Sequence, residues 1–326
     1  MDQKRIIDEF KELVSIEVHS RDERAIADVL KEKLTALGLT VTEDKAGEVL
    51  GGNTGNLYAQ LPGSADGEPV LFSAHMDRVG NHGHIVPLAK EEEGKIVSDG
   101  TSILAGDDIG GVAAILAMLR EVKEKQIPHG PIEVAFSVCE ETGVEGSRQY
   151  DFSKFRSKSA FVYDASGKAG TIVLAAPSKG RVTIRVHGVT AHAGNEPEKG
   201  LNALKVAADL IMQLPDGRLS PVSTANFSII EAGSATNVVC DLVTITGEQR
   251  SRDAKEYQQI SADIQAAADR ISEKYHTKIE VELHTLYHAF KLEETARPCV
   301  LAKEAAEAAC AVPFFKEGGG GMDANH

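Results

Sequence analysis

The segment from Val70 to Asp77 is an apolar run of β-favouring residues that ends in a histidine and an aspartate. Such a run predicts a buried strand, and alternation of side chains along a strand places His75 and Asp77 on the same face. Ligands of open α/β sheets bind beyond the carboxyl ends of the strands, where both residues are expected. An imidazole beside a carboxylate suits a metal ligand with an orienting neighbour, although for this pattern alone a simple hydrogen-bonded pair is the commoner outcome.

Two aspartates stand at the start of a predicted apolar helix over 109–119. Asp107 and Asp108 follow Gly106 directly. A carboxylate at this position can simply cap the helix, because it accepts hydrogen bonds from free amides and favours the positive end of the helix dipole. This explanation fits Asp108 better than Asp107, since the turn at Gly106 is expected to direct the Asp107 side chain into the crevice beyond the strands.

Two more predicted strands end in acidic residues. The strand over 132–139 ends in Glu140 and Glu141, and the strand over 159–163 ends in Asp164. Adjacent glutamates at the mouth of a sheet repel each other and lose solvation unless a cation lies between them or one of them is protonated. One histidine and several carboxylates at one edge fit a two-metal hydrolytic centre, in which one glutamate is a ligand and the other a free general base.

The helices before the first strand are predicted from apolar spacing and end signals. Apolar residues recur at helical spacing over 6–14. A second helix is predicted to start at Ser20, where Glu23 completes a capping box, and to end before Gly38. Both helices belong to the same predicted α/β domain as the strands.

The residue pattern changes after Pro177. Strict alternation of polar and apolar residues over 181–188 predicts a strand with one solvated face. The elements predicted after it are a helix over 202–214, strands over 224–231 and 238–250, a helix over 254–275 and a strand over 278–284. This β-α-β-β-α-β order predicts an inserted α+β, ferredoxin-like domain over 178–291. The first domain is then formed by 1–177 and 292–326.

Composition and charge exclude several classes of protein. The 326 residues carry 35 Lys and Arg against 49 Asp and Glu, a net charge of −14, which argues against nucleic acid or an anionic membrane as the main partner. Without a signal peptide or an apolar run of membrane-spanning length, a cytoplasmic location is expected. The four cysteines form no C-x-x-C pair, so neither a zinc ribbon nor a disulfide framework is predicted.

The order of these acidic and histidine residues resembles the co-catalytic zinc exopeptidase family, which includes peptidase T, carboxypeptidase G and succinyl-diaminopimelate desuccinylase. The residues that carry the resemblance are, in chain order, His75-x-Asp77, Gly106-Asp107-Asp108, Glu140-Glu141 and Asp164. It covers nearly the whole chain, and segments 98–111 and 318–325 are most similar to the peptidase T branch. The resemblance implies a mixed-sheet α/β catalytic domain with helices on both faces and an inserted lid or dimerisation domain.

The resemblance also implies a set of metal ligands. His75, Asp107 and Asp164 would bind one zinc, and Asp107 would bridge to a second zinc that Glu141 also binds. Sites of this kind accept Co²⁺ or Mn²⁺ in place of Zn²⁺. Relatives continue past the glycine-rich loop to a histidine that completes the second site. Because His326 does not match that position, we expect either that the chain is truncated before it or that the last ligand of the family is lost.

Five further roles follow from the resemblance. Glu140 would be the general base, and Asp77 would orient the metal-binding histidine. His192 would stabilise the oxyanion, often from the partner subunit, because the segment around it is similar to the lid motif of the family. Asn237 and Arg250 match positions that bind substrate, and the planar guanidinium of an arginine suits a peptide carboxylate. From the residues alone, a structural loop histidine, a turn asparagine and a solvated strand-end arginine are equally good or better interpretations.

The expected protein is a cytoplasmic tripeptide aminopeptidase of the peptidase T type that acts on short peptides and forms a homodimer through the lid domain. One alternative is an amidohydrolase that removes acyl groups from N-acylated amino acids with the same metal core. Another is a metal-binding relative without catalysis. A nucleotide-binding α/β protein is not favoured, because the sequence has neither a G-x-G-x-x-G after its first strands nor a Walker loop.

Overall fold

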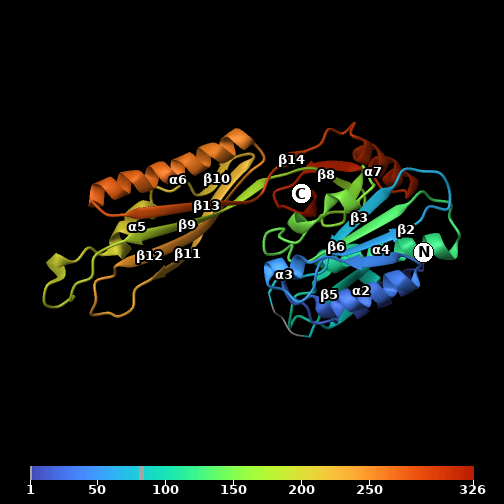
Figure 1. Ribbon diagram of the computed structural model, residues 1–326, viewed down its shortest axis with the longest axis horizontal. Helices are drawn as coiled ribbons and strands as arrows, with labels where there is room; N and C mark the ends of the chain where they lie inside the picture. The colour runs from blue at the N-terminus through green and yellow to red at the C-terminus, as the bar shows by residue number, and fades with distance from the viewer. Residues whose placement is uncertain (1, 81–83) are drawn as a thin grey trace. The chain divides into compact units, whose positions relative to one another are not determined.

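The computed structural model describes residues 2–80 and 84–326, which form two compact units (Figure 1). Unit 1 contains the chain up to Val173, Glu293–Lys316 and Met322–His326, and unit 2 contains Leu174–Leu292 and Glu317–Gly321. The predicted insertion over 178–291 falls within unit 2, and its assignment as a lid or dimerisation domain stays a prediction. The glycine-rich segment, predicted to belong to the first domain, packs with unit 2 instead.

Unit 1 is built on a mixed five-stranded sheet. Its strands, in spatial order, are β1 (Thr40–Glu43), β2 (Leu57–Leu61), β6 (Ile132–Ser137), β3 (Val70–His75) and β7 (Ala160–Val162). β1, β2 and β6 pair antiparallel, whereas β3 lies parallel to both β6 and β7, with His75 opposite Ser137. The carboxyl ends of β3, β6 and β7 therefore meet at one edge, as the sequence predicted.

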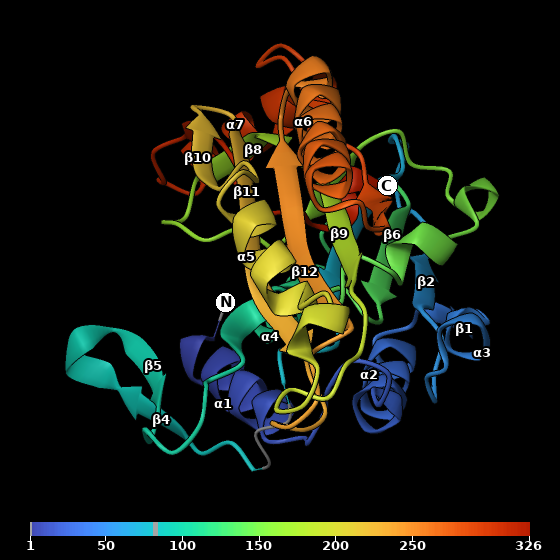
Figure 2. The same ribbon diagram turned by 90° about the vertical axis from the view of Figure 1, so that its left-hand side faces the viewer.

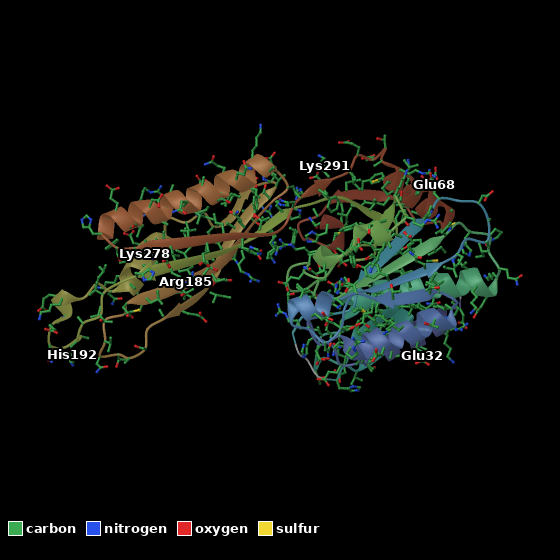
Figure 3. All side chains as sticks on the ribbon, viewed as in Figure 1. Glu32, Glu68, Arg185, His192, Lys278 and Lys291 are labelled. Carbon is green, nitrogen blue, oxygen red and sulfur yellow. The ribbon has the colours of Figure 1, made fainter. Side chains whose placement is uncertain are left out.

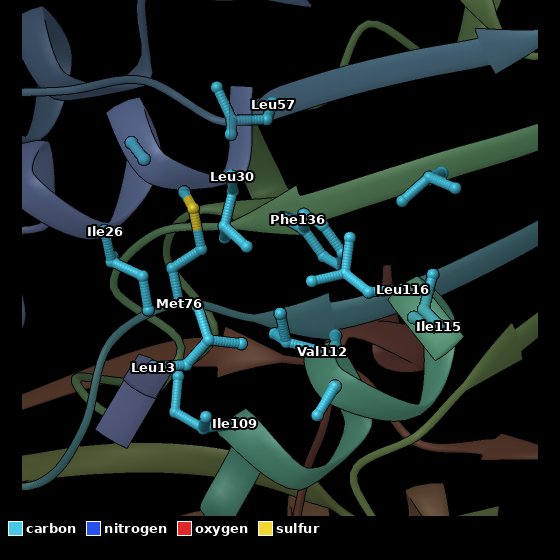
Figure 4. Packing of buried hydrophobic residues seen from close by; sticks show 14 of the residues in the cluster. Leu13, Ile26, Leu30, Leu57, Met76, Ile109, Val112, Ile115, Leu116 and Phe136 are labelled. Carbon is cyan, nitrogen blue, oxygen red and sulfur yellow. The ribbon is translucent and has the colours of Figure 1, made fainter. Parts of the chain in front are cut away.

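Helices α1 (Gln3–Val14), α2 (Arg24–Ala36) and α4 (Gly106–Glu124) pack against one face of this sheet. Figure 4 shows side chains from all three helices interdigitating with side chains of the strands. The largest fully buried residues there include Leu13, Ile26, Leu30, Leu57, Met76, Ile115, Leu116 and Phe136. Burying each such side chain contributes about 1.5–3 kcal/mol, which makes this core the rigid base on which the strand ends are held. α7 (Arg297–Ala308) lies on the opposite side of the sheet in Figure 1.

The predicted capping box of the second helix is wrong. α2 begins at Arg24, four residues after Ser20, and its N-cap residue Glu23 makes no capping hydrogen bond with its side chain. Both side chains point elsewhere: Ser20 Oγ donates to Asp77 Oδ2 at 2.6 Å, and Glu23 Oε1 accepts from the Cys139 amide at 3.0 Å. Long-range hydrogen bonds have replaced the local ones that the motif suggested.

Unit 2 contains an antiparallel sheet covered on one face by two helices (Figure 2). Its elements are β9 (Ser178–His187), α5 (Ala203–Ile211), β10 (Gly217–Ser220), β11 (Ser223–Ala232), β12 (Leu242–Ser251), α6 (Ala254–Tyr275) and β13 (Ile279–Tyr287). The sheet order β10-β11-β12-β9-β13 contains the four strands of a ferredoxin-like unit, as predicted, plus β10, which was missed. β12 begins at Leu242 rather than at Val238, because Val238 pairs with His192 in an isolated bridge.

The remaining elements are short. They are α3 (Ala46–Leu50), the hairpin of β4 (Pro87–Lys90) and β5 (Lys95–Ser98), and the strands β8 (Thr171–Ala176), β14 (Phe290–Lys291) and β15 (Phe314–Glu317). Within the described residues, no helix has the length and apolar content needed to cross a membrane. Cys139, Cys240, Cys299 and Cys310 are free thiols.

Candidate metal centre and hydrolytic site

His75, the last residue of β3, has a hydrogen-bond partner at each ring nitrogen and is only 1% exposed. Nδ1 lies 3.0 Å from the backbone carbonyl oxygen of Asp77, and Nε2 lies 3.1 Å from Asp107 Oδ1. Donation of Nδ1–H to the carbonyl fixes the tautomer, so Nε2 is the nitrogen that can bind a metal. Burial alone would lower the pKa of His75, but hydrogen bonds with Asp107 and Asp77 raise it well above its usual value.

Asp77 is fully buried and uses both carboxylate oxygens. Oδ1 lies 3.3 Å from His75 Nδ1 and accepts the Glu140 amide at 3.0 Å. Oδ2 accepts from Ser20 Oγ at 2.6 Å and from the Glu141 amide at 3.2 Å. Burial raises the pKa of Asp77, but the hydrogen bond from His75, the positive charge of that ring and the Ser20 hydroxyl outweigh it, so the pKa is lowered. Asp77 is thus a carboxylate shared between the end of β3 and the turn after β6.

Asp107 and Asp108 point in different directions at the start of α4, where both have non-helical backbone angles and the peptide bond between them is cis. Asp107 faces the Nε2 atom of His75 with a side chain that is 71% exposed. Asp108 is buried and accepts hydrogen bonds from the Gly111 amide at 3.2 Å and from the His75 amide at 3.3 Å. Asp108 therefore caps the helix, as the structural explanation predicted, while Asp107 lies in the site.

Acidic residues from the ends of β6 and β7 and from the start of α4 converge on His75. Ligand atoms of His75, Asp107 and Glu141 lie within 4.8 Å of one another, and so do those of His75, Glu140 and Asp164. Asp107 and Asp164 also share a hydrogen bond. All four predicted ligands are brought together, as is the predicted base. The division of these ligands between two ions, and of base and ligand roles between Glu140 and Glu141, stays a prediction.

The charge distribution fits a divalent cation at this cluster. Burial, with the neighbouring carboxylates, raises the pKa of Glu140 to about 9 and that of Asp164 to about 8. The pKa of Glu141 is raised for the same reasons. Without a cation, Glu140 and Asp164 are therefore mainly protonated at neutral pH, and a divalent ion can replace these protons. One imidazole nitrogen with several carboxylate oxygens is a donor set that suits Zn²⁺, Co²⁺ or Mn²⁺.

In unit 2 the structure brings His192 and Asn237 together. His192 pairs with Val238 in an isolated bridge, and the Ala193 amide donates to the Asn237 carbonyl oxygen at 3.0 Å. His192 is exposed on the loop between β9 and α5, where Figure 3 labels it. Its Nδ1 accepts from the Gly194 amide at 3.2 Å and also from the next amide in the chain at 3.1 Å, which assigns the ring proton to Nε2. Nε2 is therefore a hydrogen-bond donor in the neutral ring.

Arg250 lies at the other end of the unit 2 sheet. It lies near the end of β12, whereas His192 and Asn237 adjoin the beginning of that strand. At roughly 3.3 Å per residue, the strand places Arg250 about 26 Å from Leu242, its first residue. Its Nε donates to Glu248 Oε1 at 2.6 Å, and Nη1 lies 3.4 Å from the Gly319 carbonyl oxygen. The alternative interpretation as a solvated arginine does not hold, because the side chain is half-buried and paired with Glu248, and the predicted role in substrate binding stays a prediction.

Comparison with known proteins places this architecture in a family. The model of the peptidase dimerisation domain matches residues 177–276, and that of peptidase family M28 matches residues 56–195. The crystal structure of aminopeptidase PepT from Bacillus cereus is 39% identical, with a TM-score of 0.88 over 100% of this chain and 87% of that one. A tripeptidase from Staphylococcus aureus is 32% identical, with a TM-score of 0.93 at the same coverage. The Bacillus subtilis protein YqjE is 36% identical over 325 residues, which is 100% of this chain and 87% of YqjE.

The chain belongs to the peptidase T family. The predicted family and the predicted mixed α/β fold with an inserted ferredoxin-like domain are confirmed. As a member of the peptidase T family, the protein is a peptidase hydrolase of the metallo-exopeptidase kind. The cluster around His75 is the possible metal site that this class requires.

Four residues near the site were not predicted to be there. Ser20 and Glu23 have a local interpretation as a capping box, and Asn56 directly precedes β2. Asn56 Oδ1 accepts the Val138 amide at 3.0 Å. The fourth residue, Asp323, is buried after the glycine-rich segment and accepts a hydrogen bond from Ser137 Oγ at 2.5 Å. In the sequence, only the polar type of these residues could have indicated a place near the site. That indication is weak, because a polar residue next to an apolar segment can equally form a cap or a turn.

Proposed function

We propose that the protein is a two-metal aminopeptidase that removes the N-terminal residue from tripeptides. The observation that carries the proposal is the convergence of His75, at the end of β3, with acidic residues at the ends of β6 and β7 and at the start of α4, in a chain of the peptidase T family. Peptidase relatives in this family are named for aminopeptidase and tripeptidase activity. His75, Asp107, Asp164 and Glu141 would hold two Zn²⁺ ions, for which Co²⁺ or Mn²⁺ can substitute.

When bound, the metal ions supply Lewis acidity. Glu140 then takes a proton from the attacking water and delivers it to the leaving amine. Its backbone amide is fixed by Asp77, so the carboxyl group stays beside the metal ligands. Asp77 also holds the ring of His75, because Oδ1 and the backbone oxygen of Asp77 both lie near Nδ1.

His192 is proposed to stabilise the oxyanion of the tetrahedral intermediate. Its two backbone donors occupy Nδ1, which leaves the protonated Nε2 to donate to a developing negative charge. Asn237 lies beside it and is proposed to bind substrate, whereas Arg250 is proposed to bind the peptide carboxylate from the other end of the sheet. One copy of unit 2 cannot supply both ends to a single site, so we propose a homodimer in which His192 and Asn237 serve the site of the partner subunit.

The experiment that tests the function pairs metal content with substrate choice. Protein purified without chelator is analysed for metal per chain, and hydrolysis of a free tripeptide is compared with that of its N-acetylated form. Two metal ions per chain with turnover of the free tripeptide alone support the proposal. Turnover of the acetylated form alone would favour the N-acyl amidohydrolase, and metal binding without any turnover would favour an inactive relative.

Assembly and location need separate measurements. Light scattering is expected to give the mass of two chains, and a mass of one chain would contradict the proposed use of the partner's lid residues. The cytoplasmic location and the exclusion of nucleic acid and membrane partners stay predictions from composition.

A further inference from the structure

The turn that follows β6 is held by side chains at four successive backbone amides. The acceptors come from three segments that are distant in sequence: the N-cap of α2, the start of β2 and the residues after β3. The four hydrogen bonds, from amide to oxygen, are Val138 to Asn56 Oδ1 at 3.0 Å, Cys139 to Glu23 Oε1 at 3.0 Å, Glu140 to Asp77 Oδ1 at 3.0 Å and Glu141 to Asp77 Oδ2 at 3.2 Å. Side chains thus replace strand neighbours along the whole turn.

The backbone of this turn needs such support. Cys139 has a φ of 51°, in the left-handed region that residues other than glycine rarely adopt. A residue in this region persists only when the surrounding structure holds it there. The Cys139 amide is the one that Glu23 binds, so Glu23 acts at the strained position, immediately before Glu140.

Glu23 stands in an environment that disfavours a carboxyl group. Its exposed fraction is 0%, and within the described residues Oε2 has no hydrogen-bond partner. Burial and the nearby Asp77 carboxylate raise the pKa of Glu23. Its Oε1 accepts the amides of Arg21 and Cys139, each at 3.0 Å. Burying a carboxyl group beside a carboxylate costs free energy, and hydrogen bonds to the buried group offset part of that cost. In Glu23 these hydrogen bonds hold the backbone at Cys139, where the chain enters the turn that carries Glu140.

We propose that Glu23 is a positioning residue that directs the Glu140 carboxyl group through the Cys139 amide. Glu23 belongs to neither of the two groups of metal-ligating side chains. The inference rests on the proposed function, in which Glu140 is the general base. It assigns to the N-terminus of α2 a part in setting proton transfer rather than in binding metal or peptide.

The test uses three substitutions of Glu23 in the full-length chain. Glu23→Met keeps the approximate size of the side chain and removes the acceptor. The turn then relaxes, and kcat is expected to fall about 10- to 100-fold, as misplacement of a catalytic group by an ångström does. KM and metal content should stay at their wild-type values. Glu23→Gln keeps the Oε1 acceptor and is expected to restore most of kcat. If the methionine variant does not fold, Glu23→Asp, with a carboxyl group one methylene shorter, takes its place with the same expectation.

A matched control comes from the other end of the same strand. Glu133 on β6 is also buried and also accepts backbone amides, those of Arg156 and Ser157 at 2.9 and 3.0 Å. Glu133→Met is expected to lower thermal stability and leave kcat unchanged. An equal loss of kcat in Glu133→Met and Glu23→Met would overturn the proposal, as would wild-type kcat in Glu23→Met.

A second readout does not depend on activity. Backbone amide hydrogen exchange of the peptide covering 138–141 is followed by mass spectrometry in the same variants. Exchange should be at least several-fold faster in Glu23→Met and unchanged in Glu133→Met. If the wild-type protein hydrolyses no peptide, the proposed function fails and exchange alone decides the role of Glu23: unchanged exchange in Glu23→Met overturns it.

Discussion

The turn after β6 in unit 1 and the sheet of unit 2 differ in how closely the structure follows the local preferences of the sequence. In unit 2, local preferences and structure agree: β9 alternates between buried and more exposed residues, and Asn202 and Asp253 cap the helices that follow them. At the turn after β6, a non-glycine residue has a left-handed backbone, and buried carboxyl groups lie close together. At the turn after β6, the chain thus departs from local preference directly beside the site where chemistry is proposed.

The largest expected effect lies in the turn. Glu140→Gln removes the proposed general base and should lower kcat about 10²- to 10⁴-fold. In the metal-free protein the free energy of unfolding should not fall, because burial raises the pKa of Glu140 to about 9 and glutamine resembles its protonated form. Tripeptide hydrolysis is measured on metal-loaded protein and urea unfolding on metal-free protein, both at pH 7. Wild-type kcat would exclude Glu140 as the base.

A core substitution in unit 2 should behave in the opposite way. Ile264 on α6 is fully buried against the unit 2 sheet. Ile264→Ala leaves a cavity and should lower the free energy of unfolding of this unit by about 2–5 kcal/mol. Since Ile264 is a core residue of α6 and not one of the proposed site residues, kcat of the folded protein should be unchanged. A loss of kcat without a loss of stability would contradict the division between the two regions.

Asp77 joins the metal ligand to the turn, so its substitution should affect both metal binding and activity. In the wild type, the Ser20 hydroxyl and two backbone amides donate to the Asp77 carboxylate. Asparagine keeps one acceptor oxygen but places an NH₂ group opposite some of these donors. Metal affinity and activity should each fall about 10- to 100-fold in Asp77→Asn, measured by zinc titration and tripeptide hydrolysis. Ser20→Ala removes one hydroxyl donor and should have a smaller effect. Equal effects of both substitutions would show that Asp77 does not orient His75.

The ion pair of Glu43 gives a pH dependence far from the turn. The hydrogen bond from Arg24 is the largest of the effects that lower the pKa of Glu43, from 4.5 to about 2. A lowered pKa in the folded state means that the stabilisation is present above pH 4.5 and is lost as the pH falls toward 2. Because the pair is partly exposed, Glu43→Gln should destabilise the protein by only about 1 kcal/mol at pH 7. The difference from wild type, measured by urea unfolding, should shrink at pH 3.

The control for that prediction is an exposed pair. Lys45 and Glu48 lie 3.7 Å apart with side chains that are 82% and 71% exposed. Glu48→Gln should leave stability unchanged at both pH values. If Glu43→Gln behaves in the same way, the buried hydrogen bonds of Glu43 do not stabilise the fold.

An effect of similarly small size is expected at the N-cap of α6. Asp253 Oδ1 accepts the amides of Lys255 and Glu256 at 2.8 and 2.9 Å. Asp253→Ala should lower the stability of unit 2 by about 1 kcal/mol, whereas Asp253→Asn, which keeps an acceptor, should have little effect. Urea unfolding distinguishes them. If the two variants lose equal stability, local capping is not what starts this helix.

The sequence determined the parts that depend on short-range pattern. Apolar runs gave β3 and β6, alternation gave β9, and the side-chain period of two placed His75 and Asp77 on one face. The convergence of acidic residues was also predictable, since parallel strands end at the same edge of a sheet.

Only the tertiary structure decided how the turn after β6 is held. Ser20 and Glu23 form a motif that ordinarily caps a helix, and nothing local distinguishes that use from hydrogen bonds to Asp77 and Cys139. Besides the nearby Arg21 amide, Glu23 binds the amide of Cys139, 116 residues away in sequence. That contact exists because the core brings the start of α2 against the end of β6. A buried backbone amide needs a hydrogen-bond acceptor, and which acceptor lies within reach depends on how the whole chain packs. The local sequence therefore cannot predict the partner of such an amide.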